Sequence, residues 1–144
     1  TREFASVKDV PLTILDYAGV EHPQREYKGR KITPPSGVSM RGFLEGKTDR
    51  PRTAEQWVAF ELFGNSYVIA GDYKALRVRT GMYGDGNWHL FDIKNDPGEN
   101  RPLDEEMHER LKQMIAIYEQ YARDKEVVPV ADDWNPWLSS ETEK

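Results

Sequence analysis

The 144-residue chain contains no cysteine. This absence excludes disulfide bonds, zinc–thiolate sites and a cysteine nucleophile from the segment. No apolar run approaches the ~20 residues that a membrane-spanning helix needs, so we expect no membrane partner. No charged stretch followed by an apolar one marks a secretory leader. What remains is 38% hydrophobic and 31% charged residues, a composition typical of a soluble globular domain.

The net charge of −5 is distributed unevenly along the chain. Residues 1–52 contain 10 Lys/Arg and 7 Asp/Glu, whereas residues 53–144 contain 10 and 18. The acidic larger part would repel a phosphate backbone, so we expect no nucleic-acid partner. The basic side chains around Tyr27 could bind an anion, but a solvated surface is the more common meaning of such a run.

The stretch Trp88–Asn100 organises the rest of the chain. Its first half predicts a strand that is apolar on both faces, and therefore a central strand covered on both sides. Pro97 and Gly98 suit the two middle positions of a type II turn. Asp96 precedes them, where its carboxylate can accept backbone N–H bonds.

The remaining patterns predict an α+β fold. Three further strand candidates precede the glycine-rich stretch of residues 79–87: Glu55–Phe63, Ser66–Ala70 and Tyr73–Val78. Gly71 and Asp72 form a two-residue hairpin turn between the last two. Leu103–Lys125 has acidic residues in its first turn, basic residues in its last and apolar residues at helical spacing. We expect an antiparallel sheet of about four strands with this helix packed on one face.

A helix over Ser6–Ala18 is predicted before this domain. Ser6 or Asp9 would serve as its N-cap and Gly19 would end it. Its apolar residues form one broad stripe: Val7, Val10, Leu12, Ile14, Leu15, Tyr17 and Ala18. The Pro- and Gly-rich residues 21–37 that follow are typical of a surface connection.

The stretch from Trp88 resembles a signature near the C-terminal end of the sulfatases, approximately Trp-x-Leu-(Phe/Tyr)-Asp-Leu-x-x-Asp-Pro-x-Glu-x-x-Asn-Leu. The matching residues are Trp88, Leu90, Phe91, Asp92, Ile93, Asp96, Pro97, Glu99 and Leu103. Pro102 stands where the family has Asn. Lys8–Gly19 also resembles a sulfatase helix, written Asp-x-x-Pro-Thr-(Ile/Leu)-Leu-Asp-x-Ala-Gly, which packs on the catalytic domain in that family.

The resemblance implies that the chain is the C-terminal part of an arylsulfatase, in the alkaline-phosphatase-like superfamily. The parent would hydrolyse sulfate esters with a formylglycine, made from Cys or Ser in Cys/Ser-x-Pro-x-Arg, and a divalent cation, usually calcium. That motif is absent here, so we expect no catalytic or cofactor-binding residue in this segment. Its role would be to brace the catalytic domain and shape one wall of the substrate cleft, in the cytoplasm or periplasm of a bacterium.

The same resemblance implies a division of the chain. Residues 1–20 would end the catalytic domain, 21–52 would form a linker with a short helix, 53–126 the C-terminal subdomain and 127–144 a tail. The expected partner is the catalytic domain, and without it the Ser6–Ala18 helix could form a homodimer. Two alternatives stay open: the tail of a phosphonate or phosphate monoester hydrolase, and a free-standing interaction module.

The acidic residues offer two places for a metal. Asp92, Asp96 and Glu99 carry oxygen ligands that calcium could use, but turn chemistry explains them without a metal. Asp132 and Asp133 mimic the metal-binding Asp-Asp pair of the sulfatases. They follow no buried strand, however, so we interpret the match as coincidence.

Other motifs have ordinary structural explanations. Ser39 fails as a nucleophile elbow, because Arg41 replaces the second glycine, and an N-cap role is favoured. The glycine-rich stretch of residues 79–87 lies between strands, so it is expected to be a hairpin loop rather than a phosphate cradle. His22, His89 and His108 show no spacing of paired metal ligands.

Overall fold

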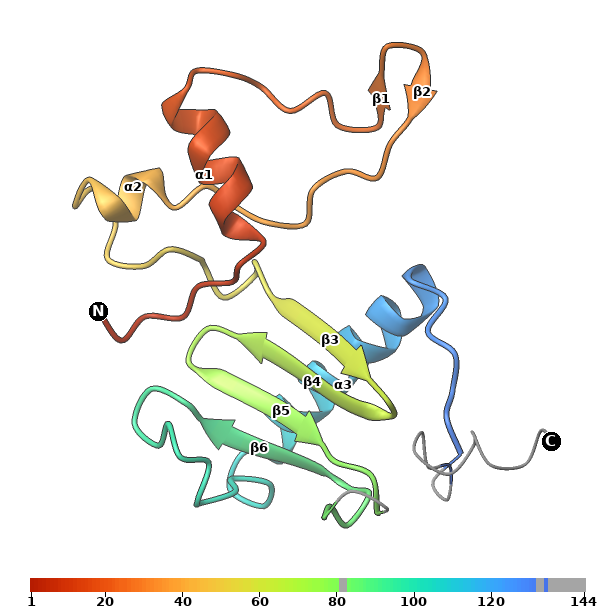
Figure 1. Cartoon of the computed structure of the whole chain (residues 1–144). Coiled ribbons are helices and arrows are strands. Elements are labelled where there is room, and N and C mark those ends of the chain that lie inside the picture. The colour runs from red at the N-terminus through yellow and green to blue at the C-terminus, as the bar shows by residue number, and fades with distance from the viewer. Residues whose placement is uncertain (81–82, 132–133, 135–144) are drawn as a thin grey trace, which may run out of the picture. The chain divides into compact units, whose positions relative to one another are not determined.

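The computed structural model describes residues 1–80, 83–131 and 134 of the chain. These residues form two compact units (Figure 1). The first comprises Thr1–Gln56, and the second begins at Trp57. Within the described residues, every helix is too short or too polar to cross a membrane.

The first unit contains two helices and a small hairpin. Helix α1 spans Asp9–Tyr17 and helix α2 spans Arg41–Leu44. Between them, β1 (Glu26–Tyr27) and β2 (Arg30–Lys31) pair antiparallel inside the predicted surface connection. The sequence did not reveal this hairpin, because its two-residue strands are too short to show an alternating pattern.

The predicted N-cap of α1 is wrong. Lys8 occupies the N-cap position and its side chain makes no capping bond. Asp9 lies inside the first turn, where its carboxylate accepts the Ser6 N–H at 2.8 Å. The helix therefore begins three residues later than Ser6, and the Asp9 side chain reaches back toward the chain that precedes it.

The second unit confirms the predicted α+β fold. Strands β3 (Val58–Leu62), β4 (Asn65–Ala70), β5 (Tyr73–Arg77) and β6 (Trp88–Asp92) form one antiparallel sheet in the order β3-β4-β5-β6. Helix α3 (His108–Asp124) packs on one face, as Figure 1 shows. The turn between β4 and β5 is the predicted pair Gly71-Asp72, since Ala70 pairs with Tyr73.

The prediction that the Trp88 strand is central was wrong, because β6 lies at the edge of the sheet. At Leu90, the backbone N–H and C=O groups that point away from β5 nevertheless form hydrogen bonds. The Leu103 N–H donates to the Leu90 carbonyl at 2.8 Å, and the Leu90 N–H donates to Asp104 Oδ1 at 2.7 Å. The chain that precedes α3 thus covers this edge, so these backbone groups of the edge strand are not left unpaired.

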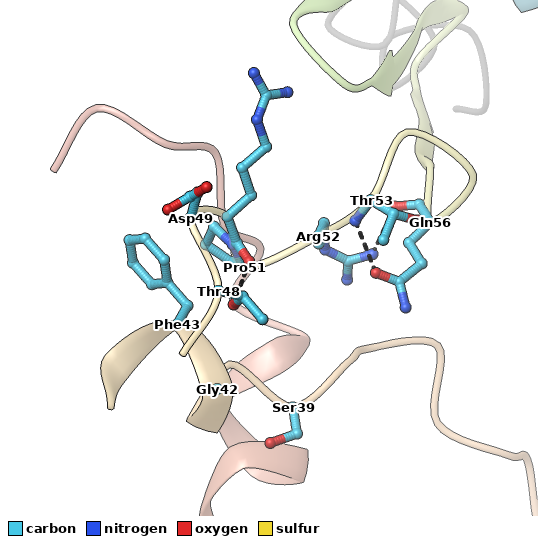
Figure 2. Close-up of a pocket in the computed structure, with 10 residues that line it drawn as sticks. Ser39, Gly42, Phe43, Thr48, Asp49, Pro51, Arg52, Thr53 and Gln56 are labelled. Carbon is cyan, nitrogen blue, oxygen red and sulfur yellow. Dashed lines mark hydrogen bonds between the residues drawn. The ribbon is translucent and has the colours of Figure 1, made fainter. Parts of the chain in front are cut away.

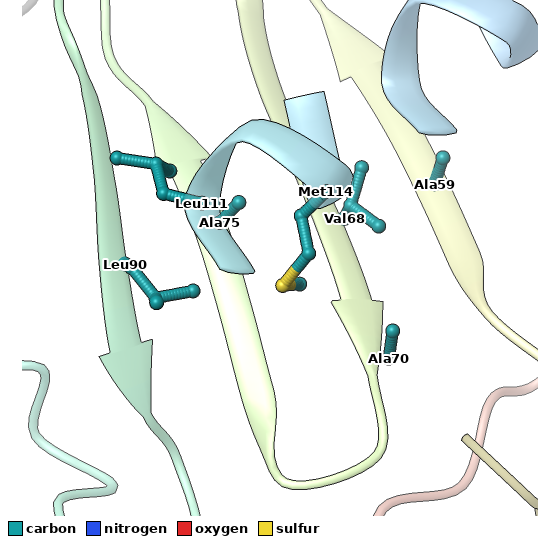
Figure 3. Packing of buried hydrophobic residues seen from close by; sticks show 7 residues of the cluster. All are labelled: Ala59, Val68, Ala70, Ala75, Leu90, Leu111 and Met114. Carbon is teal, nitrogen blue, oxygen red and sulfur yellow. The ribbon is translucent and has the colours of Figure 1, made fainter. Parts of the chain in front are cut away.

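The hydrophobic core lies between the sheet and α3. Register places Ala59, Val68, Ala75 and Leu90 in one row across the four strands. Figure 3 shows Leu111 and Met114 of α3 pointing toward this row. Two of the four strand residues are alanines, whose small side chains leave room for the helix to approach the sheet.

Candidate functional site

Strand β6, which contains the first residues of the sulfatase-like signature, places large side chains on both faces of the sheet. Trp88 lies on the helix side, where its ring centroid is 5.0 Å from that of Tyr118. Leu90 is fully buried on the same side, and Phe91 is buried on the opposite one. The strand therefore contributes to two packing layers.

The predicted type II turn after this strand was wrong. The Glu99 N–H does donate to the Asp96 carbonyl at 3.1 Å. A type II turn, however, needs positive φ at its third residue, and here the positive φ of 54° belongs to Glu99 rather than to Gly98. Asp96 explains the difference, because its carboxylate accepts the amide N–H groups of Asn100 at 2.7 Å and Arg101 at 2.8 Å.

These bonds confirm that Asp96 accepts backbone N–H groups, as the sequence predicted. The Arg101 amide contributes most to lowering the pKa of the Asp96 carboxyl below its ordinary value, and burial opposes this shift only partly. The charged carboxylate is the form that accepts these bonds. Asp96 therefore holds the chain in a curl that directs residues 100–103 back toward β6.

The other acidic residues of the signature bind different partners. Asp92 accepts bonds from Asn95 and from the Lys94 N–H, which lower the pKa of its carboxyl. Glu99 lies 2.6 Å from Lys74 Nζ on β5. Among the described residues, no three His, Asp or Glu side chains gather as metal ligands would. The calcium alternative for Asp92, Asp96 and Glu99 stays a prediction.

His89 holds a position that its sequence spacing did not indicate. Its Nδ1 lies 2.7 Å from Asp104 Oδ2, and its Nε2 lies 3.0 Å from Asp85 Oδ2. Partial burial opposes the charged imidazolium, but the two carboxylates raise the pKa of His89 above its ordinary value. The Asn87 backbone N–H, with smaller help from His89, lowers the pKa of Asp85 to about 2.

This histidine joins the glycine-rich stretch to the sheet. Residues 79–87 do connect β5 with β6 as a hairpin loop, and the Gly86 N–H donates to the Val78 carbonyl at 3.0 Å. A cavity of about 520 Å³ lies under the loop, lined by Leu76, Val78, Tyr83, Gly84, Asp85, His89 and Phe91. Leu76, Val78 and Phe91 make part of its lining apolar, and the Asp85 and His89 side chains in the lining are paired with each other.

The first unit contains a buried polar network centred on Asp9, which is 0% exposed. The Asp9 carboxylate accepts bonds from the Val38 N–H at 2.9 Å and from Arg52 Nε at 2.9 Å. Burial raises the pKa of this carboxyl, but Arg52 and the backbone amides lower it further, so the pKa lies below its ordinary value.

Thr13 extends this network by one turn of α1. Its hydroxyl accepts the Met40 N–H at 2.9 Å and donates to the Asp9 carbonyl at 2.8 Å. Gly37 allows the close approach, since a Cβ there would lie 1.9 Å from the Lys8 carbonyl oxygen. The polar face of α1 is therefore fastened to residues 37–40.

Ser39 belongs to the same region but not in the predicted role. Met40 occupies the N-cap position of α2, so the prediction for Ser39 was wrong by one residue. Its hydroxyl still accepts the Arg41 N–H at 3.2 Å and donates to the Asp16 carboxylate. This serine therefore joins α1 to α2 and has no catalytic geometry of the nucleophile-elbow kind.

An open cavity of about 530 Å³ lies beside the network (Figure 2). Figure 2 shows Phe43 and Thr48 on one side of it and Arg52 and Gln56 on another. The Arg52 guanidinium is paired with Asp9 and also donates to the Gln56 carbonyl at 2.9 Å. The cavity therefore presents Arg52 as a neutralised group rather than as a free cation.

The apolar stripe of α1 faces away from this network. Val7 is 83% exposed, Ile14 62%, Tyr17 50% and Val10 44%. The buried helix residues are Asp9 and Thr13. The helix thus buries a polar face and exposes an apolar one, the reverse of an ordinary surface helix.

Asp132 and Asp133 lie outside the residues that the structure describes, so the structure provides no geometry for that pair. Trp134 is described, and its ring lies 5.9 Å from Phe63 and 5.4 Å from the Arg79 guanidinium. This contact brings the chain after α3 to the turn between β3 and β4.

Comparison with known proteins finds a relative by sequence that is described as a sulfatase. An uncharacterized sulfatase of Schizosaccharomyces pombe is 32% identical over 134 residues, which are 92% of this chain and 24% of the yeast protein. No family model matches the chain. The chain therefore spans about a quarter of the length of the relative that it matches.

Solved structures share the fold. The crystal structure of Ps i-CgsB matches 85% of this chain and 25% of its own, with a TM-score of 0.62 and 21% identity. A second structure, of BT1596, a 2-O GAG sulfatase, matches 83% of this chain and 25% of its own, with a TM-score of 0.54 and 20% identity. Both matches again cover about a quarter of the longer chain.

Proposed function

The chain resembles the C-terminal part of a sulfatase, and from that premise we propose that it completes a longer protein that hydrolyses sulfate esters. The 32% identity over nearly the whole chain carries this proposal. The signature from Trp88 to Leu103 supports it, because those residues build the edge strand, the turn and the lead into α3. Their role in this proposal is structural.

In this arrangement the segment braces the catalytic part and forms one wall of its cleft. The support comes from α1, which exposes Val10, Ile14 and Tyr17 while its polar face is occupied within the first unit. An apolar stripe of this kind gains free energy only when another surface covers it. The catalytic part is the proposed cover, with residues 1–20 belonging to it and residues 53–126 forming the subdomain.

The chemistry would reside in the preceding part of the longer protein. A formylglycine there would supply the nucleophile, and a divalent cation, calcium in our proposal, would stabilise charge on the sulfate oxygens. This chain would supply neither a nucleophile nor metal ligands. Its contribution would be measured in the stability and substrate affinity of the assembled enzyme.

Reading the coding sequence upstream of Thr1 tests the proposal. We expect a Cys/Ser-x-Pro-x-Arg motif in the same reading frame. A long upstream reading frame without that motif would favour the phosphonate or phosphate monoester hydrolase alternative. An upstream stop codon would instead favour a free-standing interaction module.

A biochemical experiment complements this test. The upstream part and this chain are produced separately, mixed, and supplied with a chromogenic aryl sulfate and calcium. We expect no turnover by this chain alone, and faster turnover by the mixture than by the upstream part alone. Turnover by the pure chain above a heat-treated control would contradict the proposal.

Alone, the chain would use the α1 stripe to form a homodimer. Light scattering at tens of micromolar should then give a mass above that of the monomer, and the variant Val10→Glu, Ile14→Glu should return it to the monomer. A monomeric wild type with an unchanged variant would show that the stripe carries no interface between copies.

A further inference from the structure

The β1–β2 hairpin has a cationic face built around Tyr27. Its register pairs Tyr27 with Arg30. The Ile32 N–H donates to the Arg25 carbonyl at 2.9 Å, so the pairing extends beyond the two short strands. Side chains two residues apart on a strand point to the same face, and those of directly opposite residues do so too. Arg25, Tyr27 and Arg30 therefore share one face of the hairpin.

The turn of the hairpin adds a third cation to this face. Lys28 and Gly29 have positive φ angles of 51° and 76°, as both central residues of a type I′ hairpin turn do. The Lys28 ammonium nitrogen lies 5.3 Å from the centroid of the Tyr27 ring. Tyr27 is nevertheless 53% exposed, so a ligand can reach the ring from solvent. The hairpin thus presents an aromatic ring flanked by three cations.

These three cations form no ion pair within the part of the chain that the structure describes. Arg52 of the same unit, in contrast, is paired with the buried Asp9. The hairpin has one carboxylate, Glu26, and it lies opposite Lys31 on the other face. Among the described helices and strands, β1 and β2 contact only each other, and Figure 1 shows them on the long connection between α1 and α2. The cationic face is therefore available to an anion from outside the chain.

The side chains of the cationic face suit a polymer that combines sugar rings with oxyanion groups. The planar guanidinium groups of Arg25 and Arg30 match the geometry of an oxyanion. The Tyr27 ring offers apolar area on which the C–H face of a sugar can pack. A long rigid polyanion such as duplex DNA is less suited, because the chain as a whole carries a net charge of −5. A flexible polysaccharide can contact the hairpin alone.

We propose that the β1–β2 hairpin binds a sulfated polysaccharide, at a site separate from the one that hydrolyses the ester. The choice of a sulfated polymer rests on the proposed function, because an enzyme for sulfate esters gains from holding a polymer that carries many of them. A polymer bound in this way keeps its other ester groups at a high local concentration near the enzyme.

Binding of the full chain to dextran sulfate tests the proposal, with uncharged dextran as the reference polymer. Affinity is measured by isothermal titration calorimetry at several salt concentrations. One variant removes the three cations of the face: Arg25→Gln, Lys28→Gln, Arg30→Gln. The matched control removes three exposed cations elsewhere and so has the same net charge: Lys47→Gln, Arg101→Gln, Lys112→Gln.

We expect the hairpin variant to bind dextran sulfate at least about tenfold more weakly than the wild type, and with a smaller salt dependence, because fewer counterions are released. The control variant should bind like the wild type. Tyr27→Ala should weaken binding about threefold and leave the salt dependence unchanged, since the ring carries no charge.

Unchanged affinity of the hairpin variant, or equal losses in that variant and the control, would overturn the proposal. A wild type that binds dextran sulfate no better than dextran at ~50 mM salt would overturn it too. Tighter binding to a single-stranded oligonucleotide with the same number of charges would assign the face to a nucleic acid and likewise overturn it. The upstream reading frame tests the proposed function separately, so either proposal can fail while the other stands.

Discussion

The two units of the chain differ in what they bury. Residues 1–56 are all described, and the buried ones are Asp9, Thr13, Pro51 and Arg52. Among its described residues, the second unit buries ten hydrophobic side chains, including Val68, Leu90 and Met114. One unit is thus held by hydrogen bonds and an ion pair, and the other by a hydrophobic core.

This difference has a thermodynamic meaning. Burial of apolar area stabilises a fold by roughly 25 cal/mol per Å², and the second unit obtains this along the whole of α3. A buried ion pair contributes little net stability, because desolvation of both charges offsets their attraction. The first unit therefore gains a specific shape from Asp9 and Arg52. In the proposed arrangement, we expect its stability to depend on a partner that covers its apolar stripe.

The largest effect is expected from Arg52→Ala. This change leaves the Asp9 carboxylate buried without its cation, which costs about 3–5 kcal/mol. Hydrogen exchange of α1 amides should report the loss, while tryptophan fluorescence should not, because all four tryptophans lie from Trp57 onward. Lys47→Ala is the control, since that side chain is 70% exposed. Unchanged exchange of the α1 amides would show that the pair does not hold the first unit together.

The corresponding change in the second unit is Met114→Ala. Met114 lies on α3 and is fully buried in the core between the helix and the sheet. Removing a fully buried methionine costs about 2–5 kcal/mol. Urea unfolding followed by tryptophan fluorescence measures it, with Glu119→Ala on the exposed side of α3 as the control. If α1 amides lost protection to the same extent, the two units would unfold together and the comparison between them would fail.

Gly37→Ala should give a smaller loss in the first unit. The added Cβ would lie 1.9 Å from the Lys8 carbonyl oxygen, so α1 must move away from residues 37–40. Overpacking of this kind costs about 1–3 kcal/mol. Gly42→Ala is the control, because the nearest atom to its added Cβ would be 3.5 Å away, an ordinary van der Waals distance. Equal effects of both substitutions on α1 exchange would argue against the close contact.

The smallest effect concerns the pH dependence of the second unit. The folded pKa of His89 is raised, so the stability that its charged form contributes is fully present below the unfolded pKa of about 6.5. It is lost as the pH rises through the folded pKa. A neutral imidazole has one N–H donor and cannot donate to both Asp85 and Asp104.

For a partly exposed pair the expected loss is below about 1 kcal/mol. Urea unfolding of wild type and His89→Gln between pH 5.5 and 9 should converge at the alkaline end. An NMR titration should place the His89 midpoint above its ordinary value. A lowered midpoint, or a constant difference between the two proteins across this range, would contradict the bridging role.

The second unit was largely predictable from its sequence, because its residues alternate and repeat with the periods of strands and helices. The hairpin turn at Gly71 and the four antiparallel strands were confirmed. The edge position of β6 was not predictable, since Leu90 obtains its outer partners from Leu103 and Asp104, a pairing that no local pattern displays. The turn type failed for a similar reason, because Asp96 bonds to amides beyond the turn.

The first unit was less predictable. The sequence predicted a broad apolar stripe on this helix, and Val10 and Ile14 of that stripe are exposed. It did not indicate that Asp9 would be buried by Arg52, 43 residues later. Pairs of charged residues at such separations leave no periodic signal. His89 was missed in the same way, because one of its two partners is 15 residues away.

Hydrogen exchange of the chain on its own tests the contrast between the units most directly. The account predicts that the amides of α1, Asp9–Tyr17, exchange at least ~100-fold faster than those of β4 and β5. On mixing with the upstream part, the α1 amides should become protected while β4 and β5 stay as they were. Equal protection of α1, β4 and β5 in the chain alone would show that the polar network stabilises the first unit without a partner, and would contradict the account.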